Sequence, residues 1–182
     1  RAETAPALGS RPLARGTSMG GVVGAQIERI ARDDPDAHEI DLSKKATFKT
    51  EHVLQIAAAL RTNTHLRELY LTNNSISTQP AVKLAYALRE NRSLKVLDLQ
   101  KNKIGSEGSQ AFAEALALNE SLIELRLLGN PEPGQKALEE WVKCLEQNVT
   151  LVSILWRLND RKSFAINKML VRNRNIAKRV RE

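Results

Sequence analysis

The stretch LKVLDLQKN at residues 94–102 decides the fold, because its spacing of three leucines and one asparagine occurs twice more in the chain. Residues 66–74 read LRELYLTNN and residues 122–130 read LIELRLLGN, each 28 residues away from the first stretch. Looser copies centre on Ile40 and Ile154. Five units with a period of 28 or 29 residues indicate a solenoid, in which each unit packs against its neighbours along the chain.

Each unit is expected to hold one strand and one helix. The three full copies fit the leucine-rich-repeat template, and their Ala- and Leu-rich second halves resemble the type found in ribonuclease inhibitor. Side chains alternate between the two faces of a strand, so Leu97 and Leu99 should point into the core. We predict an α/β leucine-rich-repeat solenoid, right-handed and curved, with five parallel strands on the concave face and helices on the convex face. Pro131 and Pro133 should lengthen or distort the loop of the fourth unit.

Recurring columns of residues mark the ends of these elements. Asparagines after the strands are expected to bond loop backbone groups: Asn74, Asn102, Asn130 and Asn159. Asparagines after the helices are expected to adopt the left-handed backbone that closes a helix: Asn63, Asn91, Asn119, Asn148 and Asn173. The predicted helix N-caps are Thr50, Thr78, Ser106 and Asp160. The predicted buried helix stripe is Ile56, Leu84, Phe112, Trp141 and Ile166.

The two ends of the chain differ from the repeats. Residues 1–25 are rich in glycine and proline and predict a flexible arm; a native start at Met19 would make residues 1–18 foreign to the natural chain. The repeat domain is expected over residues 26–182, with an N-terminal capping helix at 26–34 and a basic capping helix at 161–182. Ile176 and Val180 are predicted to lie on the buried side of that last helix.

The net charge of +7 is concentrated at the C-terminus. Residues 1–156 hold 19 Lys/Arg and 19 Asp/Glu, whereas residues 157–182 hold nine Lys/Arg and two acidic residues. A cluster of one sign attracts acidic partners. The candidate contact residues there are Arg157, Arg161, Lys162, Lys168, Arg172, Arg174, Lys178 and Arg179. Tyr70, Asp98 and Arg126 are the candidates on the open face of the sheet.

The sequence lacks the patterns of common catalytic sites. His38, His52 and His65 are not at metal-ligand spacing, and neither a phosphate-binding loop nor a nucleophile elbow is present. Cys144 falls in an alanine column and predicts a buried thiol. We therefore expect a non-enzymatic protein that uses no metal, no cofactor and no small-molecule substrate. Without a membrane-span or secretion-signal pattern, it is expected to be cytoplasmic.

The flanks of the repeats carry a family resemblance. Residues 27–30, IERI, and residues 34–42, DPDAHEIDL, resemble the entry to the leucine-rich-repeat domain of tropomodulins and leiomodins, as does ALRTNTH at residues 59–65. FAINKML at residues 164–170, followed by NRNIAKR at residues 173–179, resembles the basic helix that closes that domain.

The resemblance implies a cytoskeletal protein that binds actin and caps filament pointed ends, with actin as the partner. The chain is expected to be a monomer. Tropomyosin is not expected to bind, because residues 1–25 contain none of that family's tropomyosin-binding helices. A general interaction scaffold that uses the open face for an unknown partner is the alternative. A GTPase-activating solenoid, and binding of nucleic acid or anionic lipid, are the weaker alternatives.

Overall fold

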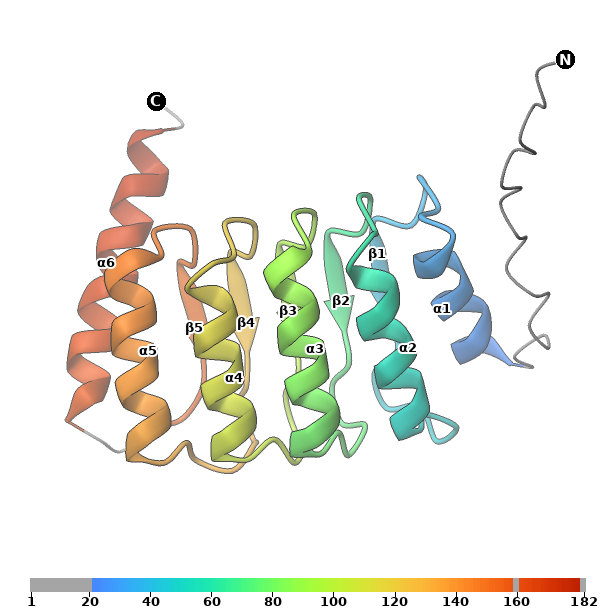
Figure 1. Ribbon diagram of the computed structural model, residues 1–182, viewed down its shortest axis with the longest axis horizontal. Helices are drawn as coiled ribbons and strands as arrows, with labels where there is room; N and C mark the ends of the chain where they lie inside the picture. The colour runs from blue at the N-terminus through green and yellow to red at the C-terminus, as the bar shows by residue number, and fades with distance from the viewer. Residues whose placement is uncertain (1–20, 159–160, 181–182) are drawn as a thin grey trace, which may run out of the picture.

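The computed structural model describes residues 21–158 and 161–180, and its five strands form one parallel sheet in chain order. The strands are β1 (Glu39–Asp41), β2 (Glu68–Tyr70), β3 (Val96–Asp98), β4 (Glu124–Arg126) and β5 (Ser153–Leu155). The helices are α1 (Val22–Ala31), α2 (Thr50–Leu60), α3 (Thr78–Glu90), α4 (Ser106–Leu116), α5 (Gln135–Gln147) and α6 (Lys162–Arg179). Figure 1 shows the helices in a row over the sheet, with α1 and α6 at the two ends. The predicted solenoid, with strands on the concave face and helices on the convex face, is confirmed.

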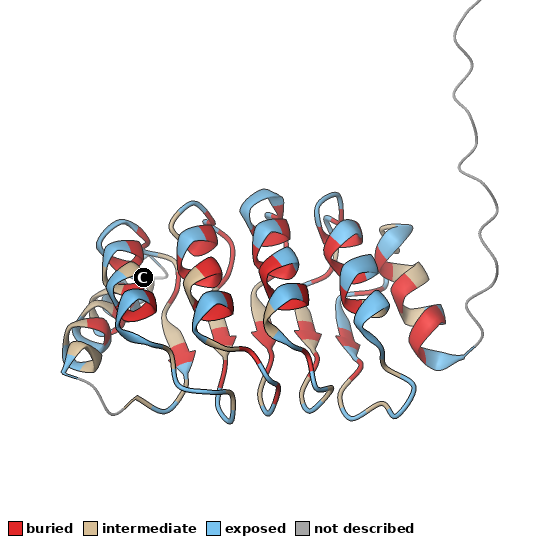
Figure 2. Ribbon diagram, turned by 60° about the horizontal axis from the view of Figure 1, so that its bottom comes forward, coloured by how far each residue is buried: buried red, intermediate tan, exposed pale blue. Residues whose placement is uncertain are grey.

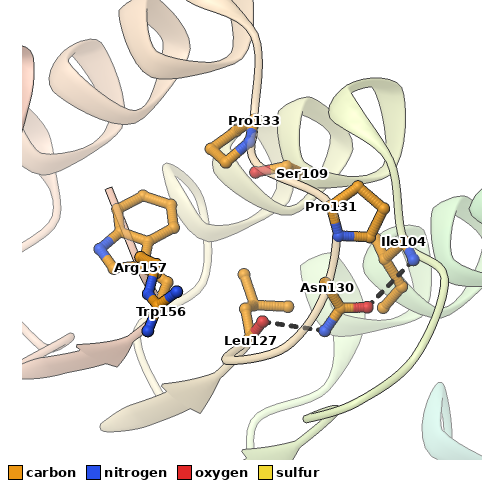
Figure 3. Close-up of a pocket in the computed structure, with 8 residues that line it drawn as sticks. All are labelled: Ile104, Ser109, Leu127, Asn130, Pro131, Pro133, Trp156 and Arg157. Atoms are coloured by element: carbon orange, nitrogen blue, oxygen red, sulfur yellow. Dashed lines mark hydrogen bonds between the residues drawn. The ribbon is translucent and has the colours of Figure 1, made fainter. Parts of the chain in front are cut away.

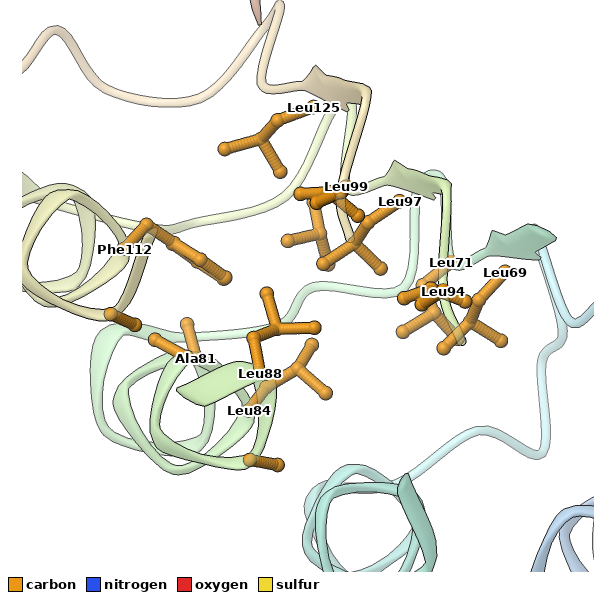
Figure 4. Close-up of a cluster of buried hydrophobic side chains, with 14 of the residues drawn as sticks. Leu69, Leu71, Ala81, Leu84, Leu88, Leu94, Leu97, Leu99, Phe112 and Leu125 are labelled. Atoms are coloured by element: carbon orange, nitrogen blue, oxygen red, sulfur yellow. The ribbon is translucent and has the colours of Figure 1, made fainter. Parts of the chain in front are cut away.

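The core lies between the sheet and the helices. One residue from each strand forms a column in exact parallel register and is buried: Ile40, Leu69, Leu97, Leu125 and Ile154. The helix stripe predicted from Ile56 to Ile166 is fully buried, and the strand leucines face it in Figure 4. Figure 2 shows the same division, with the buried side of each helix turned toward the sheet. The inward strand positions are therefore as the alternation predicts.

Two aromatic residues fill the core near the C-terminal end. The Trp141 indole packs edge-on against Trp156, with ring centroids 5.2 Å apart, and its Nε1 donates to Ser109 Oγ at 3.0 Å. Cys144 is buried beside them in the hydrophobic core, and burial raises the pKa of its thiol to about 12. The prediction of a buried thiol is confirmed.

The first asparagine column has the predicted role. Asn102 Nδ2 donates to the Leu71 and Leu99 carbonyls at 3.0 and 2.9 Å, and its Oδ1 accepts from the Asn74 and Ile76 N–H groups at 3.0 Å. One side chain thus satisfies backbone groups of two successive units. Asn159 lies outside the described residues.

The second asparagine column does not adopt the predicted left-handed backbone. Asn91 has φ −69° and ψ 136°, and its buried side chain bonds the preceding unit instead: Nδ2 donates to the Leu60 and Asn63 carbonyls at 2.7 and 3.0 Å. Asn119 and Asn148 make equivalent pairs of bonds. Asn63 bonds the Ile30 carbonyl, and Asn173 bonds the Asn148 and Leu151 carbonyls. Left-handed backbone occurs in the turns after the strands, at Lys44, Asn73, Ser75, Lys101 and Gly129, and after α1 at Asp33.

The predicted N-caps are also wrong. Thr50, Thr78 and Ser106 are the first residues inside their helices, and no capping side-chain bond forms at Ser77 or Gly105. Instead, Thr78 Oγ1 accepts from the Gly105 N–H and Ser106 Oγ from the Gly134 N–H, each at 3.0 Å. These hydroxyls therefore join successive units. Asp160 lies outside the described residues.

Element bounds at the ends and in the fourth unit differ in detail from expectation. α1 begins at Val22 rather than at residue 26. Residues 127–134 join β4 to α5, one residue more than the seven between β3 and α4, as the prolines there predicted. Residues 1–20 lie outside the described residues, so the division into an arm and a repeat domain stays a prediction.

Candidate protein-binding surface

The three candidates on the open face meet in one cluster. Arg126 Nε donates to Glu124 Oε1 at 2.6 Å, and its Nη1 reaches Asp98 Oδ2 at 3.4 Å. The same guanidinium lies over the Tyr70 ring, 5.7 Å from its centroid, while the Tyr70 hydroxyl donates to Glu68. The strand register explains why these side chains lie together, because Tyr70, Asp98 and Arg126 are paired positions of adjacent parallel strands.

Within this cluster Asp98 is buried rather than open to a partner. Only 4% of the residue is exposed, since Thr72, Gln100 and Arg126 enclose its carboxylate. Burial alone would raise the pKa of Asp98, but the hydrogen bonds from these residues outweigh it and lower the pKa. The hydrogen bond to Glu68, with burial, raises the pKa of Tyr70 to about 12.

Two acidic members of the cluster were missed as site residues. Glu68 and Glu124 occupy the first outward position of their strands, two residues before Tyr70 and Arg126. Both stand at the same position of the repeat, and this shared position is the sequence signal that could have identified them. Glu124 and Asp98 contact the Arg126 guanidinium, and Glu68 accepts from Tyr70. The cluster thus holds three carboxylates and one guanidinium, so the centre of the open face is acidic.

Most of the basic candidates are exposed and free of ion pairs among the described residues. These are Arg157, Arg161, Lys168, Arg174, Lys178 and Arg179. Arg174 makes one long contact, from Nη2 to the Val152 carbonyl at 3.4 Å. The set lies on α6 and the segment leading into it, at one end of the solenoid (Figure 1).

Two basic candidates hold α6 to the body of the domain instead. The partly buried Arg172 donates through Nη2 to the Leu145 and Asn148 carbonyls at 2.6 and 3.1 Å. The last carbonyls of a helix have no intrahelical partner and carry partial negative charge, so a guanidinium there stabilises the end of α5. Lys162 Nζ contacts Glu139 Oε1 at 2.7 Å and Gln135 Oε1 at 3.0 Å, again on α5. Arg172, a candidate contact residue by sequence, is thus engaged in anchoring α6.

The prediction that Ile176 and Val180 are buried is wrong. They are 37% and 81% exposed, and the buried residues of α6 are Ile166, Leu170 and Asn173. The spacing from Leu170 to Ile176 equals that from Leu145 to the buried Leu151, but the latter spans a helix end and a turn. Because α6 continues as a helix beyond Leu170, residue 176 rotates away from the core.

Arg157 lies at a small cavity beside the loop of the fourth unit (Figure 3). The cavity has a volume of about 20 Å³ and is lined by Pro131, Pro133 and Trp156 among others. This volume suits one water molecule rather than a substrate.

The sequence profile of the family described as TMOD/LMOD Leucine-rich domain matches residues 22–176. The chain belongs to this tropomodulin and leiomodin leucine-rich domain family. A solved structure titled "Leiomodin-1 Actin-Binding Site 2 (ABS2)" is 25% identical, with a TM-score of 0.81 over 88% of this chain and 94% of that one. The Caenorhabditis elegans tropomodulin C-terminal domain is 20% identical, with a TM-score of 0.82 over 88% of this chain and 98% of that one. No curated protein sequence matches the chain.

Two negative findings describe this member of the tropomodulin and leiomodin family. Among the residues that the structure describes, no group of three or more His, Cys, Asp or Glu side chains could hold a metal ion. None of the described helices combines the length and the apolar character needed to cross a lipid bilayer.

Proposed function

We propose that this chain is a non-catalytic, cytoskeletal actin-binding domain of the cytoplasm that caps filament pointed ends. The family supports this proposal, since a solved relative with the same fold is titled an actin-binding site. The observation that carries it is the set of exposed basic side chains at the α6 end, which no acidic side chain of the described chain neutralises. Exposed single-sign charge steers association with an oppositely charged surface.

The division of the basic residues dictates the test. Charge reversal at Lys168, Lys178 and Arg179 removes exposed cations without touching the bonds of Arg172 or Lys162 to α5. The triple Glu variant should lose cosedimentation with actin filaments and slow pointed-end elongation less than wild type, while its circular dichroism stays unchanged. Wild-type binding should weaken as salt is added, because screening acts on exposed charge.

The matched control reverses the same number of charges elsewhere. Lys83, Arg89 and Lys136 are exposed on α3 and α5, and changing each to Glu alters the net charge equally. This control should keep binding to actin. If both triple variants lose binding alike, net charge rather than the α6 surface is responsible. If wild type binds no actin at all, a scaffold for a different acidic partner replaces the proposal.

A further inference from the structure

The strongest unassigned feature is an apolar groove beside the C-terminal half of α6. It has a volume of about 530 Å³. Its apolar lining is Ile123, Val149, Val152, Ile176, Ala177 and Val180. Val149 is 46% exposed, which adds to the exposure of Ile176 and Val180. Exposed apolar side chains gathered in one concave place are typical of a protein interaction site.

The charges at the groove are mainly positive. Lys95, Arg174 and Lys178 line it together with one acidic residue, Glu120. Within the described part of the chain none of these three cations forms an ion pair. The groove therefore complements a ligand that is apolar in the middle and acidic at its margin.

The backbone along the groove is already paired between the units. The N–H groups of Lys95, Ile123 and Val152 donate to the carbonyls of Arg67, Lys95 and Ile123 at 2.7, 2.8 and 2.9 Å. A peptide strand cannot use these donors, so recognition must come from side chains. An amphipathic helix that places its apolar face in a groove binds in this way.

We propose that this groove binds an amphipathic helix of a partner protein, with apolar residues on one face and carboxylates along its flank. Branched side chains of the helix pack on Ile176, Val180 and Val149. The flanking carboxylates meet Lys95, Arg174 and Lys178. This goes beyond the actin proposal and does not depend on it, although Arg174 and Lys178 belong to both surfaces.

The test uses a fluorescent synthetic helix of about 18 residues, composed of Leu, Ala and Glu with the leucines on one face. Its binding is measured by fluorescence anisotropy with the full chain. We expect saturable binding, weakened at least tenfold by Ile176→Gln combined with Val180→Gln. Val171→Gln is the matched control, because Val171 is 49% exposed on the same helix but does not line the groove. It should change the affinity less than twofold.

A second peptide with Lys in place of Glu should bind at least tenfold more weakly. Absence of saturable binding, equal binding of the two peptides, or equal binding by the groove variant and wild type would each overturn the proposal. Sedimentation velocity tests whether a second copy of the chain fills the groove instead. A wild-type dimer, together with a monomeric Ile176→Gln, Val180→Gln variant, would show that it does and would overturn the proposal. Neither groove substitution alters charge, so actin cosedimentation of the same variant separates failure here from failure of the actin proposal.

Discussion

Replacing Asn91 by alanine should destabilise the domain strongly, although the residue touches no ligand surface. The side chain is 1% exposed and sits between two units. Its Oδ1 accepts from the Ser93 and Leu94 N–H groups at 3.0 and 2.8 Å, and its Nδ2 donates to the Leu60 carbonyl at 2.7 Å. Asn63 is less affected, because its carbonyl also accepts from Ser93 Oγ at 3.0 Å.

The structure sets the size of the effect. Asn91→Ala leaves three buried backbone groups without this partner, and each such group costs about 1 to 3 kcal/mol. Water entering the vacated space offsets part of that cost. We therefore expect a loss of about 3 to 5 kcal/mol, which is a large share of the roughly 5 to 15 kcal/mol of a typical domain.

Equilibrium urea unfolding followed by circular dichroism measures this loss. Asn175→Ala is the control, because Asn175 is exposed on α6 and alanine favours helix, so its stability should be unchanged or slightly higher. A loss below about 1 kcal/mol for Asn91→Ala, similar to a surface substitution, would refute the reasoning. It would mean that the inter-unit backbone groups find other partners.

Two further predictions concern the core and the N-terminal cap. Leu99→Ala, at a residue with 0% exposure, should cost about 2 to 5 kcal/mol, whereas Leu155→Ala, at 42% exposure, should cost far less; equal losses in urea unfolding would contradict the strand register. Asp33 accepts from the Thr64 N–H and hydroxyl, both at 2.7 Å. Burial alone would raise the pKa of Asp33, but bonds from Thr64 and His65 outweigh it and lower the pKa from 3.8 to about 2. A lowered folded-state pKa stabilises the fold above pH 3.8, and this contribution disappears as pH falls toward 2. Asp33→Asn should therefore lower the urea midpoint at pH 5 and have little effect near pH 2; a difference between the two proteins that does not change with pH would contradict the assignment.

The repeat period predicted the fold because equivalent residues of successive units pack in equivalent environments. A leucine at a fixed place in every unit must find the same buried environment, so register follows from spacing alone, as the column through Leu97 shows. The alternation within a strand also assigned Tyr70 and Arg126 to the open face. It could not predict that Asp98 is buried, because that depends on Thr72, Gln100 and Arg126 closing over it.

The errors at the helix ends have a common physical origin. Asparagine and threonine were interpreted by their local preferences, for left-handed backbone and for N-capping. In a solenoid, however, each helix end lies against the preceding or following unit, whose backbone groups are also unpaired. Asn91 and Thr78 bond those neighbours instead. Residues that recur in a repeat therefore indicate bonds between units as readily as bonds within one.

α6 closes the end of the solenoid and also presents exposed side chains to solvent. Asn173 continues the asparagine ladder from the middle of this helix, and Arg172 beside it binds the end of α5. These bonds fix the rotation of α6, and the rotation leaves Lys168, Lys178 and Ile176 exposed. Some basic residues at the C-terminus therefore anchor α6 to α5, whereas the others are exposed to solvent. The bonds to α5, and not the charge alone, distinguish the two groups. Substitutions that respect this division can alter binding while the solenoid stays closed.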